Sequence, residues 1–186
     1  MDLKGKKIAI LATHGFEQSE LEVPHDRLKK AGAIVEVISL AAGEIKGWDV
    51  KDWGRPVKVD KVLSDARVED YDAIVLPGGQ INPDLLRIND DAISLIRAFY
   101  DSGKTVAAVC HAPWLLIEAG LANGRNMTSY KSIKTDVINA GAKWEDSQVV
   151  VDQGVITSRN PGDFEAFSAK IIEEVKEGRH IRRSAA

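Results

Sequence analysis

The sequence predicts an α/β protein with a mostly parallel, doubly wound sheet, helices on both faces of the sheet, and a small hairpin excursion. Short runs rich in Ile, Val, Leu and Ala alternate with amphipathic stretches of helical length, which is the pattern of successive β-α-β units. The chain has 186 residues, 44% of them hydrophobic and 28% charged, which suits one domain with a substantial core. No repeat, linker or low-complexity segment divides it, so we expect residues 1–186 to form a single domain.

The N-terminal part predicts a strand, a helix and a second strand. An apolar run at residues 8–12 predicts the first strand, and residues 17–31 predict a helix closed by Gly32. Pro24 lies inside this helix, where a proline bends the helix or shifts its start. Residues 34–40, which are rich in β-branched residues, predict the second strand.

The next segment, residues 41–60, has no helical period and contains three glycines and a proline. This composition predicts a hairpin or an irregular excursion from the sheet. Trp48 and Trp53 lie on the excursion, and two interpretations of them are open. They can cap the edge of the core, or they can contribute to a subunit interface, where exposed aromatic residues concentrate.

The middle of the chain predicts a strand, a capped helix and another strand. Residues 71–79 form an apolar run that ends in a Pro-Gly-Gly turn, where glycine permits backbone conformations that other residues avoid. Asn89 is the expected N-cap of a helix at residues 90–101, and a buried strand follows at residues 105–109. The remaining predicted elements are a helix that begins after His111, a short strand at 126–128, a helix at 131–140, a hairpin at 148–158 that turns at 152–154, a closing helix at 163–176 and a loose basic tail at 178–186.

Cys110 is the only cysteine, and it stands where the strand at residues 105–109 stops and a helix begins. A thiol at such a turn projects above the sheet, and the positive end of the following helix favours the thiolate. A cysteine that only fills the core is expected inside the apolar run and not after it. The position therefore predicts a nucleophile, with His111 beside it.

Two further segments lead to the same edge of the sheet as Cys110. The Gly78-Gly79 turn and the loop at residues 14–17 also follow strands. Open parallel sheets bind ligands outside the carboxyl ends of their strands. We therefore expect the three segments to form one site.

Composition excludes several classes of function. The net charge of −3 and the pI of about 5.8 give no electrostatic footprint for nucleic acid. A single cysteine cannot form an internal disulfide, and neither a signal segment nor a run of about 20 apolar residues is present. His25 and His180 stand apart, and no cluster has metal-ligand spacing. We expect a cytoplasmic protein without a membrane partner, a nucleic-acid partner, a metal or a cofactor.

A series of motifs occurs in a characteristic order. They are Phe-Glu at 16–17, Leu-Pro-Gly-Gly at 76–79, Val-Cys-His-Ala-Pro at 109–113, Thr-Ser-Tyr at 128–130 and Asp-Val-Ile-Asn-Ala-Gly-Ala at 136–142. This series resembles the PfpI family of the ThiJ/PfpI superfamily over residues 5–177. The resemblance implies a flavodoxin-like sandwich and a superfamily of intracellular cysteine peptidases, glyoxalases, proposed protein deglycases, chaperones and a redox sensor.

The resemblance also implies roles for site residues. It assigns Glu17 as the carboxyl group near the Cys110 sulfur. If burial keeps that acid protonated and raises its pKa, it can donate a hydrogen bond to a thiolate or to a sulfinate. It assigns His111 as general base and acid, oriented by Asp84 from a neighbouring subunit. Asp84 is one methylene shorter than the glutamate of relatives, and this assignment requires at least a homodimer.

The remaining implied site residues surround the thiol. The resemblance implies that two backbone N–H groups bind an oxyanion. One belongs to Gly79 in the Gly78-Gly79 turn, and the other belongs to His111 in the sharp turn at Cys110, which we call the elbow. His14 and Tyr130 are expected to line the mouth of the site. Two interpretations of Trp114 are open: it can form part of the pocket wall, or it can pack in the core. Ala112 replaces a glycine of many relatives, which narrows the pocket slightly.

Three functions remain open at this point. The first is a cysteine-dependent enzyme of the stress response, with glyoxalase or deglycase chemistry on small aldehydes or glycated proteins. The second is an intracellular peptidase with a triad of Cys110, His111 and Asp84. The third is a redox-sensing or chaperone-like stress protein. The shortened acid at position 84 favours the first, because aldehyde chemistry asks less of an orienting carboxylate than peptide hydrolysis does.

Overall fold

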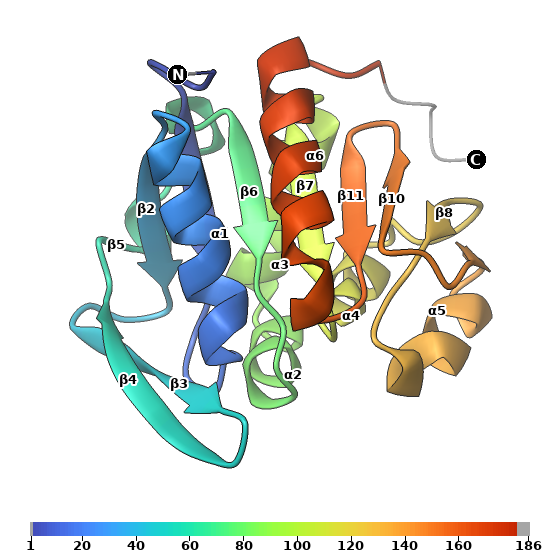
Figure 1. Ribbon diagram of the computed structural model, residues 1–186, viewed down its shortest axis with the longest axis horizontal. Coiled ribbons are helices and arrows are strands. Elements are labelled where there is room, and N and C mark those ends of the chain that lie inside the picture. Colours follow the sequence, from blue (N-terminus) through green and yellow to red (C-terminus); the bar gives the residue numbers. More distant parts are fainter. Residues whose placement is uncertain (1, 182–186) are drawn as a thin grey trace.

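The computed structural model describes residues 2–181 and is built on a seven-stranded sheet (Figure 1). The strand order is β10-β11-β7-β6-β1-β2-β5, and each neighbouring pair is parallel except β10 with β11. The strands are β1 (Lys7–Leu11), β2 (Ile34–Ser39), β5 (Lys61–Val62), β6 (Ala73–Leu76), β7 (Thr105–Val109), β10 (Val149–Asp152) and β11 (Val155–Ser158). The predicted α/β fold with a mostly parallel sheet is confirmed.

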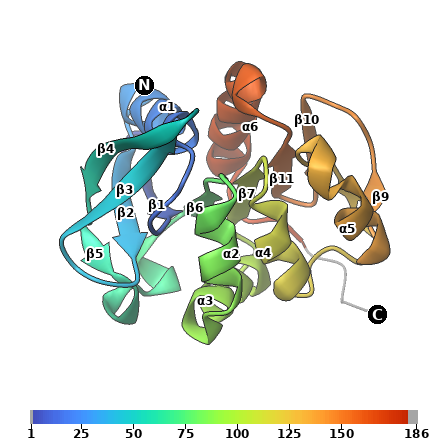
Figure 2. The same cartoon turned by 90° about the horizontal axis from the view of Figure 1, so that it is seen from below.

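Helices cover both faces of the sheet (Figure 2). One face is covered by α1 (Gln18–Lys30) and α6 (Phe164–Glu177). The other is covered by α3 (Asp90–Asp101) and α4 (Pro113–Glu118), with α2 (Ile81–Arg87) and α5 (Lys134–Asn139) packed against α4. Two small sheets and four 3-10 helices complete the fold: β3 (Glu44–Asp49) with β4 (Asp52–Lys58), β8 (Asn126–Met127) with β9 (Lys143–Trp144), η1 (Leu63–Asp65), η2 (Val68–Asp70), η3 (Lys131–Ile133) and η4 (Pro161–Asp163).

The central strands are apolar at successive positions because both of their faces are buried. In β1, Ile8 and Ile10 belong to the core beneath α1 and α6, while Ala9 and Leu11 belong to the core beneath α3 and α4. All four are fully buried. Strands of this kind appear in sequence as continuous hydrophobic runs, which is why they could be recognised.

Several local predictions are confirmed. The Asn89 side chain accepts a hydrogen bond of 2.9 Å from the Ala92 backbone N–H, as an N-cap of α3 does. The chain turns between β10 and β11 where a hairpin was expected. Helix α1 begins at Gln18 and continues through the buried Pro24, so the proline does not displace its start.

Other predictions need correction. The helix expected at 131–140 is divided into η3 and α5, and helix α2 was not predicted. The hairpin predicted within residues 41–60 is confirmed as β3 and β4, in which Trp48 and Trp53 pair edge to face with ring centroids 5.7 Å apart. Residues 178–181 of the expected tail form no helix or strand, and the rest of the tail lies outside the described residues. Within residues 2–181, no helix has the length and apolarity needed to cross a bilayer.

The sheet order positions the site. Strand β1 lies between β2 and β6, so the chain leaves β1 toward one side and later returns on the other. Such a reversal opens a crevice at the carboxyl ends of the strands, where ligands bind in folds of this type. Cys110 follows β7, which pairs with β6 beside this crevice.

Candidate active site

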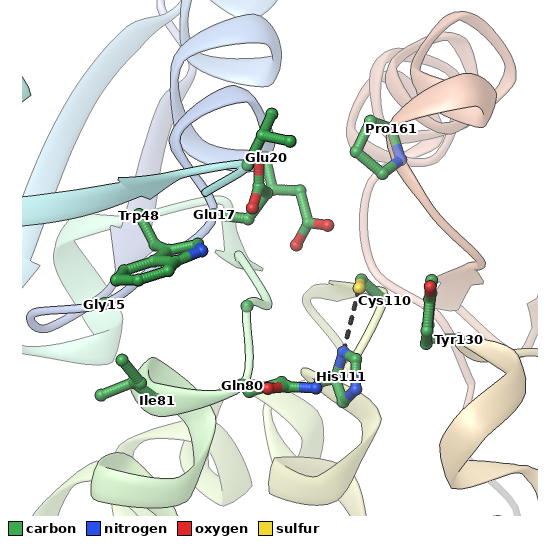
Figure 3. Close-up of a pocket in the computed structure, with 12 residues that line it drawn as sticks. Gly15, Glu17, Glu20, Trp48, Gln80, Ile81, Cys110, His111, Tyr130 and Pro161 are labelled. Carbon is green, nitrogen blue, oxygen red and sulfur yellow. Dashed lines mark hydrogen bonds between the residues drawn. The ribbon is translucent and has the colours of Figure 1, made fainter. Parts of the chain in front are cut away.

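A cavity of about 600 Å³ opens at the carboxyl ends of β1, β6 and β7 (Figure 3). Each of the three predicted segments contributes to it, and the β3–β4 hairpin adds a fourth wall. The lining residues are Gly15, Glu17, Glu20, Trp48, Val50, Gly79, Gln80, Ile81, Cys110, His111, Tyr130 and Pro161. The expected convergence of separate loops on one site is therefore present.

Cys110 occupies a strained turn between β7 and α4. Its φ is +64°, a left-handed conformation that costs a residue with a side chain roughly 1–2 kcal/mol. Two backbone hydrogen bonds hold it: its N–H donates to Ser158 at 3.0 Å, and its carbonyl accepts from the Tyr130 N–H at 2.8 Å. The residue is 6% exposed. The predicted sharp turn thus places a nearly buried thiol at the edge of the cavity.

The carboxyl group beside the thiol belongs to Glu20, and the assignment of this contact to Glu17 is wrong. Glu20 is fully buried, and its Oε2 accepts a hydrogen bond of 2.7 Å from the Gly78 N–H. Burial raises the pKa of Glu20 to about 8, while hydrogen bonds from Cys110 and from the Gly78 backbone oppose the increase. Glu20 therefore holds a proton at neutral pH.

Glu17 lines the same cavity in a different role. It is the N-cap residue of α1, has extended backbone geometry, and forms an isolated β-bridge with Trp48. The pKa of Glu17 lies above its ordinary value. Burial and the negative charge of Asp49 raise the pKa, and a hydrogen bond with Ser19 opposes part of the increase. A raised pKa was expected for the acid at the sulfur, and Glu20 is the residue that meets both conditions. Glu20 lies one helical turn later, and only its spacing from Glu17 could have suggested it.

The thiol does not ionise as readily as its place before a helix suggested. Burial raises the pKa of Cys110, and the charge of an ionised Glu20 raises it further. The backbone N–H groups of Gly79 and His111 face the sulfur and lower the pKa of the thiol. Helix α4 has only six residues, so its end supplies little potential. The repulsion disappears when Glu20 is protonated, and a protonated carboxyl group can donate to the sulfur.

His111 lies against the thiol and is held on several sides. Its Nδ1 is 3.1 Å from the Cys110 sulfur, and its Nε2 is 3.0 Å from the hydroxyl oxygen of Ser132. The Tyr130 ring stacks on the imidazole at 4.8 Å, and the Trp114 ring meets it edge to face at 5.3 Å. Burial lowers the pKa of His111, so the imidazole is neutral at pH 7. Trp114 thus contacts His111 while also packing on the core. No pattern in the sequence indicates Ser132.

Three predicted site residues, Asp84, His14 and Gly78, lie outside the cavity lining. Asp84 is exposed on α2 and has no hydrogen bond or ion pair with any residue in the described chain. His14 is exposed, and its Nδ1 accepts a hydrogen bond of 3.1 Å from the Lys46 N–H. The expectation that His14 lines the mouth is therefore wrong. Tyr130 does line it, and Trp48 is a lining residue that was assigned only to the core edge or an interface.

The Gly78-Gly79 turn is compact enough to require both glycines. A Cβ atom on Gly78 would lie 2.6 Å from Glu20 Oε2 and 2.7 Å from the Val109 carbonyl oxygen. A Cβ atom on Gly79, where φ is +75°, would lie 2.6 Å from the Gly15 carbonyl oxygen. Close approach of these backbones brings the acid, the thiol and the amide donors together.

One group of ligand-type side chains lies away from the cavity, at the end of α6. Single ligand atoms of Glu174, Glu177 and His180 lie within 4.8 Å of one another. The expectation that no residues form a metal-ligand cluster is therefore wrong in geometric terms. The spacing of three residues along a helix brings the two glutamates together, and the turn after Gly178 adds the histidine.

Comparison with known proteins agrees with the architecture. The model of the DJ-1/PfpI family matches residues 6–174. The chain is 43% identical over 169 residues to Protein/nucleic acid deglycase 2 of Escherichia coli, covering 90% of this chain and 96% of the relative. It is 41% identical over 170 residues to Deglycase PH1704 of Pyrococcus horikoshii, covering 91% and 99%. The crystal structure of Drosophila melanogaster DJ-1beta superposes with a TM-score of 0.84 at 32% identity, over 92% of this chain and 90% of that one. The chain belongs to the DJ-1/PfpI family.

Proposed function

We propose that this protein is a cysteine-dependent enzyme that acts on small reactive aldehydes or on the glycated groups they form, by glyoxalase or deglycase chemistry. The observation that carries the proposal is the setting of Cys110, which lies beside the acid Glu20 and 3.1 Å from the neutral imidazole of His111. A nucleophile, a proton donor and a proton acceptor are what addition to a carbonyl needs. The deglycase names of two relatives add support.

The first step is addition of the Cys110 sulfur to a carbonyl carbon. A C–S bond forms, the π bond of the carbonyl breaks, and negative charge develops on the oxygen. The N–H groups of Gly79 and His111, which face the sulfur in the free protein, can stabilise that oxygen. The proton lost by the thiol ends on the oxygen, and the product is a hemithioacetal.

Glu20 is suited to the next step on a dicarbonyl such as methylglyoxal. A carboxyl group with a pKa of about 8 can take up and return protons near neutral pH. In its ionised form it removes the proton from the carbon that bears the new hydroxyl, and the proton returns at the adjacent carbon. The resulting thioester is hydrolysed by water. Overall, the dicarbonyl and one water become a 2-hydroxy acid, and the thiol is regenerated.

Deglycase chemistry uses the same first intermediate. When the carbon attacked carries a glycated amine, the C–N bond breaks as the C–S bond forms, and the amine leaves with a proton. His111 is the nearest imidazole to the sulfur and can supply that proton. The hemithioacetal left on Cys110 then follows the route already described.

Peptide hydrolysis has weaker support. It needs a base that is firmly oriented and a protonated leaving amine, yet within the described chain the Nε2 of His111 faces a serine hydroxyl and no carboxylate. Asp84 can orient His111 only if a second copy of the chain presents it. The peptidase alternative therefore requires a homo-oligomer in which Asp84 reaches the neighbouring His111.

The test compares the wild-type protein with the Cys110→Ser variant on methylglyoxal and, separately, on an unstructured protein. We expect the wild type to consume methylglyoxal and form lactate, and the variant to do neither above background. Cleavage of the protein substrate without lactate formation would favour the peptidase. If the wild type consumes neither substrate faster than the variant, the enzymatic proposals fail and redox sensing through Cys110 is favoured.

A second measurement separates deglycation from removal of free aldehyde. Glycated amines release aldehyde reversibly, so a glyoxalase alone lowers adduct levels by depleting the free pool. Adducts of N-acetylarginine and of a guanine nucleotide are incubated with the protein and a large excess of an aldehyde scavenger. Adduct loss faster than with scavenger alone supports direct deglycation. If the adducts disappear no faster than with the scavenger alone, the protein acts on free aldehyde by glyoxalase chemistry and does not deglycate directly. The nucleotide arm tests the expectation that nucleic acid is not a substrate.

A further inference from the structure

We propose that Ser132 positions His111 and completes, within one chain, a hydrogen-bonded series from Cys110 through His111 to Ser132 that carries a proton between the buried sulfur and solvent. The inference rests on the proposed carbonyl chemistry of Cys110 and adds a residue and a route to it. It gives Nε2 of His111 a partner within its own chain.

The contacts form a continuous path. The sulfur lies 3.1 Å from Nδ1 of His111, and Nε2 of the same ring lies 3.0 Å from the Ser132 hydroxyl. His111 is only 4% exposed, whereas Ser132 is exposed to solvent. Ser132 is therefore where the path reaches water. Both ring nitrogens are occupied, and each occupant can exchange a proton with the ring.

A single loop holds this arrangement against the elbow. The Tyr130 N–H donates to the Cys110 carbonyl at 2.8 Å, and the Tyr130 ring stacks on His111 at 4.8 Å. Ser132 follows in η3, so its hydroxyl is anchored to the same backbone that fixes the cysteine. The ring is thus held from its face and from its edge by one short segment, and its rotation is restricted.

A hydroxyl suits a relay better than a carboxylate does. It can accept a hydrogen bond from Nε2–H and donate one to unprotonated Nε2, so it supports both neutral tautomers of His111. A carboxylate only accepts, and it would hold the proton on Nε2. Among the described residues, the charged and titratable groups around His111 come from several elements. Cys110 and Tyr130 contact the ring, and Glu20 of α1 lies beyond the sulfur. Arg87 of α2 lies over the Trp114 ring at 5.3 Å, and Asp136 of α5 accepts a hydrogen bond of 2.8 Å from the Trp114 indole N–H.

The proton transfers balance. The S–H bond of Cys110 breaks as Nδ1 of His111 gains the proton. The Nε2–H bond breaks as the Ser132 oxygen gains that proton, and the original hydroxyl proton passes to water. After the sulfur has added to a carbonyl, Nδ1–H protonates the new oxyanion, and Nε2 regains a proton from water through Ser132. His111 and Ser132 then carry protons at the same positions as at the start, and the adduct carries the proton that the thiol lost.

The test measures alkylation of Cys110 by iodoacetamide as a function of pH. Since the chain has one cysteine, the reaction reports on this sulfur alone and does not depend on knowing the substrate. We expect Ser132→Ala to slow alkylation at pH 7 by up to about tenfold and to move the profile to higher pH, because the hydrogen bond that accepts the Nε2 proton as the thiol ionises is lost. Ser132→Thr keeps the hydroxyl and should restore the rate to within about twofold.

The matched control is Ser64→Ala. Ser64 is also the exposed middle residue of a 3-10 helix, and its hydroxyl is bound only to the neighbouring Asp65. This variant should keep the wild-type profile. Equal melting temperatures for all variants would exclude a general loss of structure, and a smaller solvent deuterium isotope effect on alkylation in Ser132→Ala would identify the relay itself.

Other outcomes overturn the inference. A wild-type profile in Ser132→Ala, or equal defects in the alanine and threonine variants, would show that the hydroxyl has no such role. A loss in Asp84→Asn that is absent in Ser132→Ala would return the orienting role to a second copy. Methylglyoxal turnover is measured in parallel: turnover with an unchanged alkylation profile rejects only the relay, whereas a shifted profile without turnover rejects only the proposed function.

Discussion

The backbone N–H of Gly78 donates a hydrogen bond of 2.7 Å to Oε2 of Glu20, and this bond ties the buried acid to the turn that follows β6. The acid is thereby kept next to Cys110 instead of pointing into solvent. A fully buried carboxyl group is stable in this position only while it is protonated or well hydrogen-bonded. The chemistry of the thiol and the stability of the fold consequently depend on one proton.

Replacing Glu20 with glutamine should separate reactivity from proton transfer. Glutamine keeps an oxygen for the Gly78 N–H and an amide donor for the sulfur, but it cannot ionise. We expect alkylation of Cys110 above pH 8 to become faster than in the wild type, since the negative charge that raises the thiol pKa is gone. Turnover of methylglyoxal should fall about 10²- to 10⁴-fold, the usual contribution of an acid-base group. A glutamine variant with full turnover would remove Glu20 from the mechanism.

Glu20 should also make stability depend on pH. Its pKa is about 8 in the folded protein against 4.5 for the free group, so the folded state binds the proton more tightly. The contribution is complete below pH 4.5 and is lost as pH rises through about 8, amounting to roughly 5 kcal/mol at most. Urea unfolding at pH 5 and pH 8.5 should show a larger decrease for the wild type than for Glu20→Gln. Parallel decreases in the two proteins would contradict the raised pKa.

Gly79 and Gly124 form a matched pair for testing the compact turn. Their φ values are +75° and +73°, but a Cβ on Gly124 meets nothing within 4 Å, whereas on Gly79 it meets backbone atoms at 2.6 and 2.7 Å. Gly124→Ala should cost about 1–2 kcal/mol from backbone conformation alone. Gly79→Ala should cost a further 1–3 kcal/mol from crowding and should abolish turnover by displacing the N–H group. Thermal melts and methylglyoxal assays measure both effects, and equal costs would show that the turn has room to adjust.

Trp48 should affect large substrates more than small ones. Its ring lines the cavity opposite Cys110, while Trp53, its edge-to-face partner, does not line it (Figure 3). An aromatic contact worth about 0.5–1.5 kcal/mol predicts a rise in KM of about 2- to 12-fold for a glycated peptide in Trp48→Ala. The KM for methylglyoxal should change little. Trp53→Ala serves as the comparison, and an equal rise in both variants would mean that hairpin stability, not contact with substrate, is responsible.

The parts of the fold that sequence could predict are those in which neighbouring residues decide the outcome. The run at Thr105–Val109 is apolar on both sides because β7 is covered on both faces, and Asn89 caps α3 through a residue three positions away. The elbow at Cys110 could be inferred because the apolar run ends there. Local pattern and tertiary structure agree at these positions.

The parts that sequence could not predict depend on contacts between distant segments. Glu17 and Glu20 are both acids at the start of one helix, and the choice between them is made when Glu17 pairs with Trp48 and Gly78 binds Glu20. Ser132 reaches His111 only because the chain after β8 returns to the elbow. The spacing of Glu17 and Glu20 makes both acids candidates but does not choose between them, and Ser132 belongs to no motif that indicates a contact with His111.

The two backbone hydrogen bonds of Cys110 also determine when the thiol becomes functional during synthesis. Its N–H is held by Ser158 in β11, and its carbonyl is held by Tyr130. A ribosome that has translated β7 but not β11 has therefore made a cysteine whose left-handed backbone has no support, with the β7 edge still open. Such an incomplete chain carries a loosely placed thiol, and the site that we propose as catalytic is complete only when the late strand β11 joins the sheet.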